Sequence, residues 1–226
     1  MILITIYVME IEKFYKIKNP SAVLWDMDGV LVQNDHMWKD GYVTQTLING
    51  HKWRDEDTKA CRGKTGEDIA KHLSTIFPID LALSIVANVE QGVVEGMDHS
   101  ILGNHSLEVL DYYFSRSIPM AIVTSSVNAV VDKYVSLLSK DYFSLHITSA
   151  DTPIGKPNPF GYQLASDKLG VNIKDCIVFE DSDTGIQAGI NSGAHVIALP
   201  RNEQWVSGEK LDVVKDLQDF YNKFLS

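Results

Sequence analysis

Short apolar runs alternate with longer amphipathic segments along most of the chain. A short apolar run is typical of a buried strand, and apolar positions spaced three and four apart are typical of a helix with one buried face. The predicted strands lie near residues 22–26, 119–124, 144–148, 176–180 and 195–199. The predicted helices lie near residues 105–116, 127–139, 159–169, 184–192 and 209–224. This alternation predicts an α/β fold in which helices cover both faces of a parallel sheet.

The pattern changes over residues 34–103, where no strand signal is clear and helical periodicity dominates. The helical periodicity is plainest in residues 67–73 and 81–87. We therefore expect a helical region between the first and the second predicted strands.

Two carboxylates follow the first predicted strand, in the sequence Asp26-Met-Asp28-Gly29. Gly29 permits a sharp turn, so both acids are expected at the carboxyl end of a strand, where open α/β sheets bind ligands. Two acids in that place can bind a hard cation, and one of them can attack an electrophile. A solvated turn is the alternative, and the motif alone does not decide between the two.

Hydroxyl groups and a lysine follow later in the chain. The strand predicted near 119–124 ends in Thr124, Ser125 and Ser126, which can bind phosphate oxygens through hydroxyl and backbone N–H groups. Alternatively, Ser126 caps the helix that follows. Lys156 lies in the sequence Gly-Lys-Pro-Asn-Pro, whose two prolines stiffen the loop. Its ammonium can neutralise a carboxylate and a phosphoryl oxygen, or it can be solvated on a rigid surface turn.

The strand predicted near 176–180 runs directly into Glu180 and Asp181. Ser182 or Asp183 can cap the next helix. Acids near a helix N-terminus also interact favourably with the helix dipole. That interaction would explain Asp183, but it explains Glu180 and Asp181 less well because they lie at the end of the strand.

In this order, the four segments resemble the motifs of the haloacid dehalogenase-like hydrolase superfamily. The resemblance extends from about Ser21 to Leu199, and the chain looks most like the branch of β-phosphoglucomutases and phosphoglycolate phosphatases, which residues 180–189 closely match. It implies a Rossmann-like core, here residues 20–33 and 104–226, with a small helical cap domain inserted after the first core strand, here residues 34–103.

The resemblance also implies a role for each matched residue. Asp26 would be the nucleophile that takes the phosphoryl group. Asp28 would be the general acid and base, protonating the leaving oxygen and then activating water. Thr124, Lys156 and the backbone of Ser125 would hold the phosphoryl oxygens. These roles agree with the chemistry, because a carboxylate that attacks a phosphate needs nearby positive charge to reduce the repulsion.

Mg²⁺ is the cofactor that the resemblance implies. Asp26, Asp181 and the backbone carbonyl of Asp28 would bind it, and Glu180 would be a further ligand or would support these ligands. Mg²⁺ prefers oxygen ligands and keeps several waters, so few protein carboxylates are needed. Asp28 also favours phosphate esters over carbon–halogen bonds as the substrate, because an alkoxide leaving group needs a proton.

The predicted cap departs from the β-phosphoglucomutase pattern at two positions. Where those mutases carry a histidine, this chain has Trp38. Where they carry a cap arginine that binds the second phosphate of the sugar, this chain has Gly66. Arg62 or Lys64 can bind the substrate instead, or both can be solvated helix-face residues. Trp38 can line the substrate site or simply anchor the packing.

These observations favour a Mg²⁺-dependent phosphatase that hydrolyses a small phosphorylated metabolite, expected to be a sugar phosphate, through an aspartyl-phosphate at Asp26. A phosphomutase of the β-phosphoglucomutase type is the alternative. A mutase must hold a bisphosphorylated intermediate, and Trp38 and Gly66 argue against it. A non-catalytic binding protein on the same scaffold is a third hypothesis, which the presence of Asp28 and Lys156 opposes.

The composition limits the classes of binding partner and the cellular compartments that we expect for this protein. The 226 residues are 45% hydrophobic and 22% charged, with a formal net charge of −10 and no basic run. We therefore expect a soluble globular protein that does not bind nucleic acid. No amphipathic seam stands out in the sequence, so a monomer is the default expectation. Residues 1–19 form an extension of unknown role, whose apolar stretch is far shorter than the roughly 20 residues of a membrane-spanning helix, so no membrane partner is expected. Two cysteines, Cys61 and Cys176, predict a reducing, cytoplasmic setting.

Overall fold

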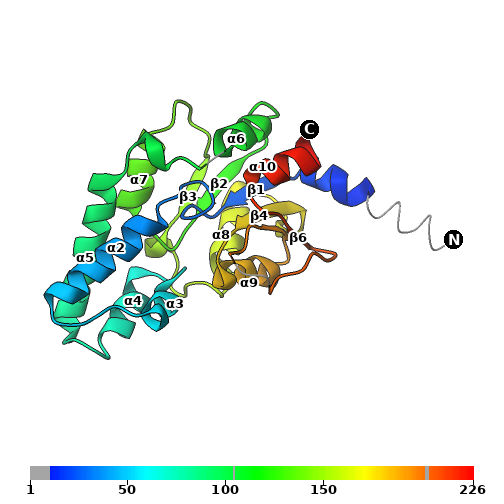
Figure 1. Ribbon diagram of the computed structural model, residues 1–226. Coiled ribbons are helices and arrows are strands. Elements are labelled where there is room, and N and C mark those ends of the chain that lie inside the picture. The colour runs from blue at the N-terminus through cyan, green and yellow to red at the C-terminus, as the bar shows by residue number, and fades with distance from the viewer. Residues whose placement is uncertain (1–10, 104, 202–203) are drawn as a thin grey trace.

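The computed structural model describes residues 11–103, 105–201 and 204–226, which fold around a sheet of six parallel strands (Figure 1). The strands lie in the order β3-β2-β1-β4-β5-β6, so the first strand of the chain is near the middle of the sheet. In chain order they are β1 (Ala22–Trp25), β2 (Met120–Val123), β3 (Leu145–Ile147), β4 (Cys176–Glu180), β5 (His195–Ala198) and β6 (Leu211–Val213). The predicted α/β fold class is confirmed.

Each central strand buries both of its faces, which explains why it is apolar without alternation. In β1, Val23 and Trp25 belong to one hydrophobic cluster, whereas Ala22 and Leu24 belong to a second cluster on the other face. The Trp25 ring stacks on Phe179 of β4, with centroids 4.1 Å apart. Burying a large side chain of this kind stabilises the fold by about 1.5–3 kcal/mol.

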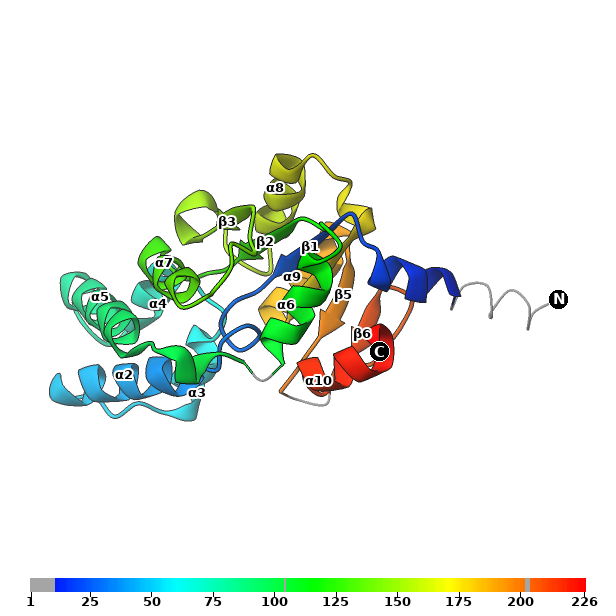
Figure 2. The same ribbon diagram turned by 90° about the horizontal axis from the view of Figure 1, so that it is seen from above.

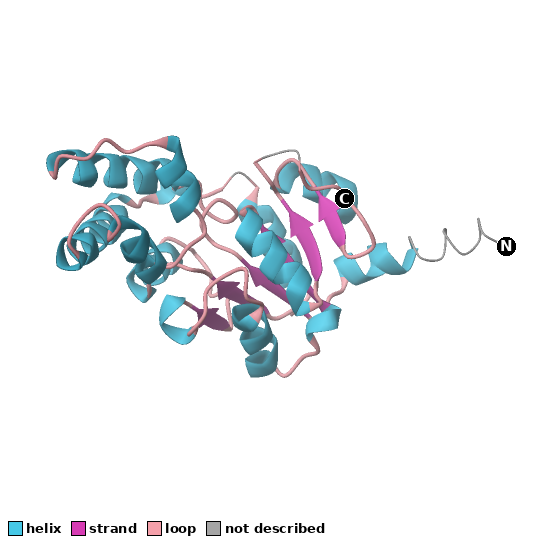
Figure 3. Cartoon of the chain, turned by 90° about the horizontal axis from the view of Figure 1, so that it is seen from below, coloured by secondary structure: helices cyan, strands magenta, loops and turns pink. Residues whose placement is uncertain are grey.

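Helices cover both faces of the sheet (Figure 3). One cluster includes side chains of residues 11–18 and of α6, α7 and α10, and the other includes side chains of α8 and α9. The bounds are α6 (Ser106–Phe114), α7 (Asn128–Ser136), α8 (Phe160–Leu169), α9 (Asp183–Ser192) and α10 (Leu217–Phe220). Short turns of other helix types are η1 (His99–Ile101), η2 (Ser149–Asp151), η3 (Ile173–Asp175) and η4 (Tyr221–Leu225).

Four further helices form a group beyond one end of the sheet (Figures 1 and 2). They are α2 (Asp35–Ile48), α3 (Asp55–Cys61), α4 (Gly66–Leu73) and α5 (Ile79–Gly96). The long helix α5 packs against α2 and α4. All four lie within residues 34–103, the region expected to be an inserted helical unit.

The prediction of one helix over residues 209–224 is wrong in its first part, because β6 pairs there with β5 at the edge of the sheet. The middle residue of β6, Asp212, is buried. Its carboxylate accepts a hydrogen bond from His195 at 2.8 Å and lies 2.8 Å from the Lys13 ammonium. Both partners are distant in sequence, so the local pattern could not show that an acid is buried in a strand here.

The extension predicted for residues 1–19 is described only from residue 11, and the apolar stretch before it lies outside the described residues. Residues 11–18 are helical. Ile17 is fully buried, and its carbonyl accepts a hydrogen bond from the Tyr113 hydroxyl at 3.0 Å. Within the described part of the chain, no helix has both the length and the apolar character needed to cross a membrane.

Candidate active site

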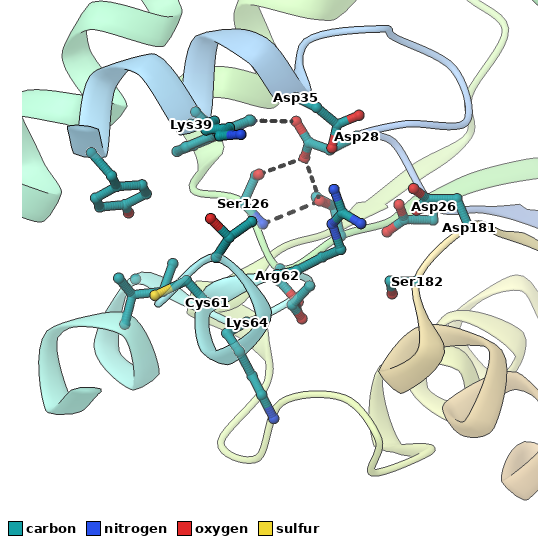
Figure 4. A pocket seen from close by; sticks show the side chains of 18 of the residues that line it. Asp26, Asp28, Asp35, Lys39, Cys61, Arg62, Lys64, Ser126, Asp181 and Ser182 are labelled. Carbon is teal, nitrogen blue, oxygen red and sulfur yellow. Dashed lines mark hydrogen bonds between the residues drawn. The ribbon is translucent and has the colours of Figure 1, made fainter. Parts of the chain in front are cut away.

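A cavity of about 360 Å³ separates the strand ends from the helices α2–α5 (Figure 4). The strand ends contribute Asp26, Asp28, Thr124, Ser125, Ser126 and Asp181 to its lining, and the helical group contributes Trp38, Tyr42, Trp53, Arg62, Lys64 and Glu90. Because the strands are parallel, residues far apart in sequence meet at one edge of the sheet.

Asp26 directly follows β1 and forms a buried ion pair with Lys156, whose Nζ lies 2.5 Å from Oδ1. The same ammonium donates to Glu180 Oε1 at 2.6 Å and to the Val123 carbonyl at 3.1 Å. Burial lowers the pKa of Lys156, but the carboxylates of Asp26 and Glu180 outweigh it and raise the pKa above its ordinary value. The lysine is therefore a charged group inside the site, with a side chain 9% exposed, and not a solvated surface residue.

Glu180, at the end of β4, is fully buried and has a donor for each oxygen. Oε1 accepts from Lys156 and from the Tyr162 hydroxyl at 2.7 Å. Oε2 accepts from the N–H groups of Asp181 and Ser182, at 3.1 and 3.2 Å, and from the Ser182 hydroxyl. This carboxylate fixes the position of the lysine and of the turn that leads into α9.

Asp26, Glu180 and Asp181 form a cluster of buried acids, each offering one oxygen within 4.8 Å of the others. Figure 4 shows the carboxylates of Asp26 and Asp181 side by side. Burial, and next the charge of Glu180, raise the pKa of Asp26 and of Asp181. Lys156 donates to Oδ1 of Asp26 and Arg201 donates to Oδ2 of Asp181, so among the described residues the second oxygen of each accepts no hydrogen bond. Such oxygens suit a hard divalent cation, which would also offset the repulsion between the acids.

The Asp28 carboxylate accepts hydrogen bonds from both sides of the cavity (Figure 4). Oδ1 accepts from Asn34 Nδ2 at 2.5 Å and from the Trp38 indole N–H at 2.9 Å. Oδ2 accepts from the Ser126 hydroxyl at 2.7 Å and from the Thr124 hydroxyl at 3.4 Å. Together these donors fix the orientation of the carboxylate inside the cavity.

One capping expectation is wrong and another is confirmed. Ser126 does not cap α7, which begins at Asn128 without a side-chain cap, because the Ser126 hydroxyl donates to Asp28 instead. Ser182 caps α9, since its hydroxyl accepts a hydrogen bond from the N–H of Gly185 at 3.1 Å.

The remaining sequence-derived candidates lie where the two sides of the cavity meet. The Ser125 hydroxyl donates to the Gly63 carbonyl at 3.1 Å, so it contacts the loop between α3 and α4. The Arg62 side chain, from the same loop, points toward the labelled aspartates in Figure 4. Lys64 also lines the cavity, but its ammonium points away from them.

Sequence reasoning missed several residues of the site, and Arg201 and Tyr162 are among them. Arg201 ion-pairs with Asp181 and with Asp35, the first residue of α2, and so connects the sheet side to the helical side. Its position just after a predicted strand was a usable signal, because that strand ends at the same edge. Tyr162, which donates to Glu180, lies in the middle of α8 and gave no such signal.

Residues 23–199 match the family model described as haloacid dehalogenase-like hydrolase. A validoxylamine A 7′-phosphate phosphatase of Streptomyces hygroscopicus subsp. limoneus is 24% identical over 88% of this chain and 95% of its own. Hexitol phosphatase A of Escherichia coli is 31% identical over 79% of this chain and 82% of its own. A β-phosphoglucomutase structure from Clostridium difficile has a TM-score of 0.73 at 17% identity, covering 92% of this chain and 99% of that chain, which supports the fold.

Proposed function

Because the chain belongs to the haloacid dehalogenase-like hydrolase family, we propose that it is a Mg²⁺-dependent phosphatase that hydrolyses a sugar phosphate through an aspartyl-phosphate at Asp26. Similarity to named phosphatases, hexitol phosphatase A among them, supports the phosphatase activity. The observation that carries the mechanism is the Asp26–Lys156–Glu180 arrangement, which holds a buried carboxylate beside a buried ammonium.

In the proposed first step, an Asp26 carboxylate oxygen attacks phosphorus while the bond to the ester oxygen breaks. Asp28, in its protonated form, gives its proton to that oxygen, and the alcohol leaves. Lys156, with Thr124 and the backbone of Ser125, contacts the phosphoryl oxygens and stabilises their charge.

In the proposed second step, the Asp28 carboxylate takes a proton from water, and the resulting hydroxide attacks the phosphorus of the aspartyl-phosphate. The bond between Asp26 and phosphorus breaks, which regenerates both aspartates and releases inorganic phosphate. The donors to Asp28 from Trp38, Asn34 and Ser126 would hold it in line with the ester oxygen and then with the water.

The residues fit Mg²⁺ as a bound cofactor. Asp26, Asp181 and the carbonyl of Asp28 would hold it, and Glu180, whose oxygens already accept hydrogen bonds, would position Lys156 behind them. When bound, the ion would supply positive charge that reduces repulsion between the carboxylates and a phosphate dianion.

Residues 34–103 would act as a cap that excludes water from the cavity, with residues 20–33 and 104–226 as the catalytic core. Arg62 would contact the substrate from this cap, and Lys64 would lie at the cavity rim. We also propose that the protein is a monomer and that it is cytoplasmic. Two buried, unpaired cysteines, Cys61 and Cys176, agree with a reducing setting.

A phosphomutase has less support. A mutase needs a second phosphate anchor in the cap, and the position expected for a cap arginine is Gly66. A Cβ at that position would lie 2.7 Å from Glu90 Oε1, so an acid occupies the neighbouring space.

The test is phosphate release from a panel of sugar phosphates and phenyl phosphate, with and without Mg²⁺. We expect release to require Mg²⁺ and to fall by about 10³-fold or more in Asp26→Asn, as for other nucleophile removals. Asp175→Asn, which changes an exposed acid far from the site, is the matched control and should keep full activity. Phosphate release that persists in a clean Asp26→Asn preparation would contradict the mechanism.

A further inference from the structure

The cavity continues beyond the aspartates into the helical group, where its walls are aromatic. Trp38, Tyr42 and Trp53 line this part. The Tyr42 and Trp53 rings stack with centroids 5.3 Å apart and planes 12° apart. The indole N–H of Trp38 donates to Asp28, and that of Trp53 donates to the Thr58 hydroxyl at 2.8 Å. Stacking and hydrogen bonds therefore hold the walls in place before any ligand binds.

Two polar groups in this part of the cavity have no partner among the described residues. Tyr42 is 4% exposed, and its buried hydroxyl makes no hydrogen bond. Glu90 of α5 is half-buried, its carboxylate is not engaged in any described hydrogen bond or ion pair, and burial raises its pKa. Leaving a buried hydroxyl or carboxylate unpaired is unfavourable, so each indicates a place for a ligand group.

The two groups line the same cavity, and the helices that carry them, α2 and α5, pack against each other. The charge of Glu90 contributes to the raised pKa of the Tyr42 phenol, after burial and Cys61. Glu90 fits because position 66 is glycine, where a Cβ would lie 2.7 Å from Oε1. Cys61 adds no charge, since burial raises the pKa of its thiol to about 12. This part of the cavity, formed by Tyr42, Glu90 and the two indoles, is here called the cap subsite.

We propose that the cap subsite binds the alcohol portion of the substrate and selects a neutral polyol or sugar that carries a single phosphate. This inference rests on the proposed phosphatase function. A carboxylate accepts hydrogen bonds only, and a phenol donates or accepts, so the pair matches alcohol hydroxyls, which do both. The indole walls suit the C–H surface of such a molecule.

Other substrate classes fit the cap subsite less well. A second phosphate would meet the negative charge of Glu90 in a half-buried setting, which is strongly unfavourable. A purely apolar alcohol would leave both polar groups unpaired. A flat heterocycle cannot insert between the rings of Tyr42 and Trp53, because these rings are already stacked on each other.

The test compares Tyr42→Phe and Glu90→Gln with the wild-type enzyme on sorbitol 6-phosphate and on phenyl phosphate. We expect each variant to raise KM for sorbitol 6-phosphate by about 10-fold, with kcat changed by less than about three-fold. KM for phenyl phosphate, which has no alcohol hydroxyls, should change by less than about two-fold. The matched control is Glu95→Gln on the same helix, where the exposed carboxylate accepts from Gln91 and lies outside the cavity lining.

Several results would overturn the proposal. For the variants, these results are equal KM changes for both esters, or an unchanged KM for sorbitol 6-phosphate in both variants. For the wild-type enzyme, they are a preference for fructose 1,6-bisphosphate over fructose 1-phosphate, or a preference for uridine 5′-phosphate over both fructose 1-phosphate and sorbitol 6-phosphate.

Absence of Mg²⁺-dependent and Asp26-dependent hydrolysis of every ester would instead contradict the proposed function. The cap subsite is then tested without turnover, by titrating free sorbitol and following the fluorescence of Trp38 and Trp53. Binding that weakens in Tyr42→Phe supports the cap subsite, and absence of binding overturns it.

Discussion

At the scale of single residues, Asp28 shows how much of the site depends on neighbours that are distant in sequence. One carboxylate oxygen is held from the helical group by Asn34 and Trp38, and the other is held from the sheet by Ser126 and Thr124. A general acid has to point at the leaving oxygen within hydrogen-bond reach. Donors from both sides of the cavity therefore determine the orientation of the Asp28 carboxylate.

Replacing Trp38 by phenylalanine keeps an aromatic wall and removes the N–H that donates to Asp28. A hydrogen bond to a charged group contributes about 1.5–3 kcal/mol, and we expect kcat to fall by about 10-fold as Asp28 loses one orienting donor. Steady-state kinetics on a sugar phosphate measures this effect.

Trp53→Phe is the matched control, because the indole of Trp53 lies in the same cavity but donates to Thr58. It should leave kcat within about two-fold of wild type. An equal loss of kcat in both variants would show that the aromatic wall, and not the hydrogen bond to Asp28, is responsible.

At the scale of elements, the helix of residues 11–18 is held to the rest of the structure by contacts with β6, η4 and η3. The Lys13 ammonium lies 2.8 Å from Asp212, and Phe14 contacts Phe224 with ring centroids 5.3 Å apart. A second ion pair, between Lys16 and Asp175, joins the same helix to the turn before β4. The two pairs differ in burial, because Asp212 is buried and the Lys16–Asp175 pair is exposed.

Asp212→Asn should lower the free energy of unfolding by about 2 kcal/mol near neutral pH, because a buried carboxylate loses hydrogen bonds from His195 and Lys13. Burial raises the pKa of Asp212, but these hydrogen bonds outweigh it and lower the pKa overall. A lowered folded-state pKa gives stability that is present above the unfolded-state pKa, about 3.9, and is lost as pH falls through the folded-state pKa.

Urea unfolding of both proteins across the acid range measures the difference. It should be constant above about pH 5 and shrink below that. Asp175→Asn is the control and should change stability by less than about 1 kcal/mol, since exposed ion pairs contribute little. A difference between wild type and Asp212→Asn that grows on acidification would contradict the assignment.

At the scale of the whole molecule, side chains connect the sheet and the helical group directly across the cavity. Arg201 pairs with Asp35 on the helical side and with Asp181 on the sheet side. Ser125 donates to Gly63 across the same gap. The two sides of the cavity are thus joined by direct contacts, and one of these contacts involves Asp181 of the proposed metal site.

Arg201→Gln should lower Tm without Mg²⁺ and enlarge the rise in Tm that Mg²⁺ produces. Removing the guanidinium of Arg201 breaks its ion pair with Asp181. A metal ion then binds the Asp181 carboxylate without competition from Arg201. A ligand at a hundred times its Kd stabilises the folded state by about 2.7 kcal/mol. Differential scanning calorimetry with and without Mg²⁺ measures both effects.

Asp181→Asn is the control and should lose most of the Mg²⁺-dependent rise. If Arg201→Gln gained less from Mg²⁺ than wild type does, Arg201 would be helping to hold the ion and not competing with it.

Local sequence patterns were enough to predict most of the sheet and the candidate site residues at its edge. Apolar runs marked five strands, and the acids, hydroxyl groups and lysine that follow them were found in one place once the strands lay parallel. Local patterns suffice for this because strand formation and turn chemistry depend on nearby residues. In the same way, position alone reduced the candidates for the cap of α9 to Ser182 and Asp183, and the structure shows that Ser182 is the cap.

The partner of each polar side chain, in contrast, depends on how the elements pack together. Ser126 donates to Asp28 and does not cap a helix, Asp212 is buried in β6, and Arg201 spans the cavity. Tyr42 and Glu90, which have no hydrogen-bond partner among the described residues, likewise come together only when α2 and α5 are packed against each other. Hydrogen bonds and ion pairs between elements depend on chain segments far apart in sequence, so no local pattern of polar and apolar residues specifies them.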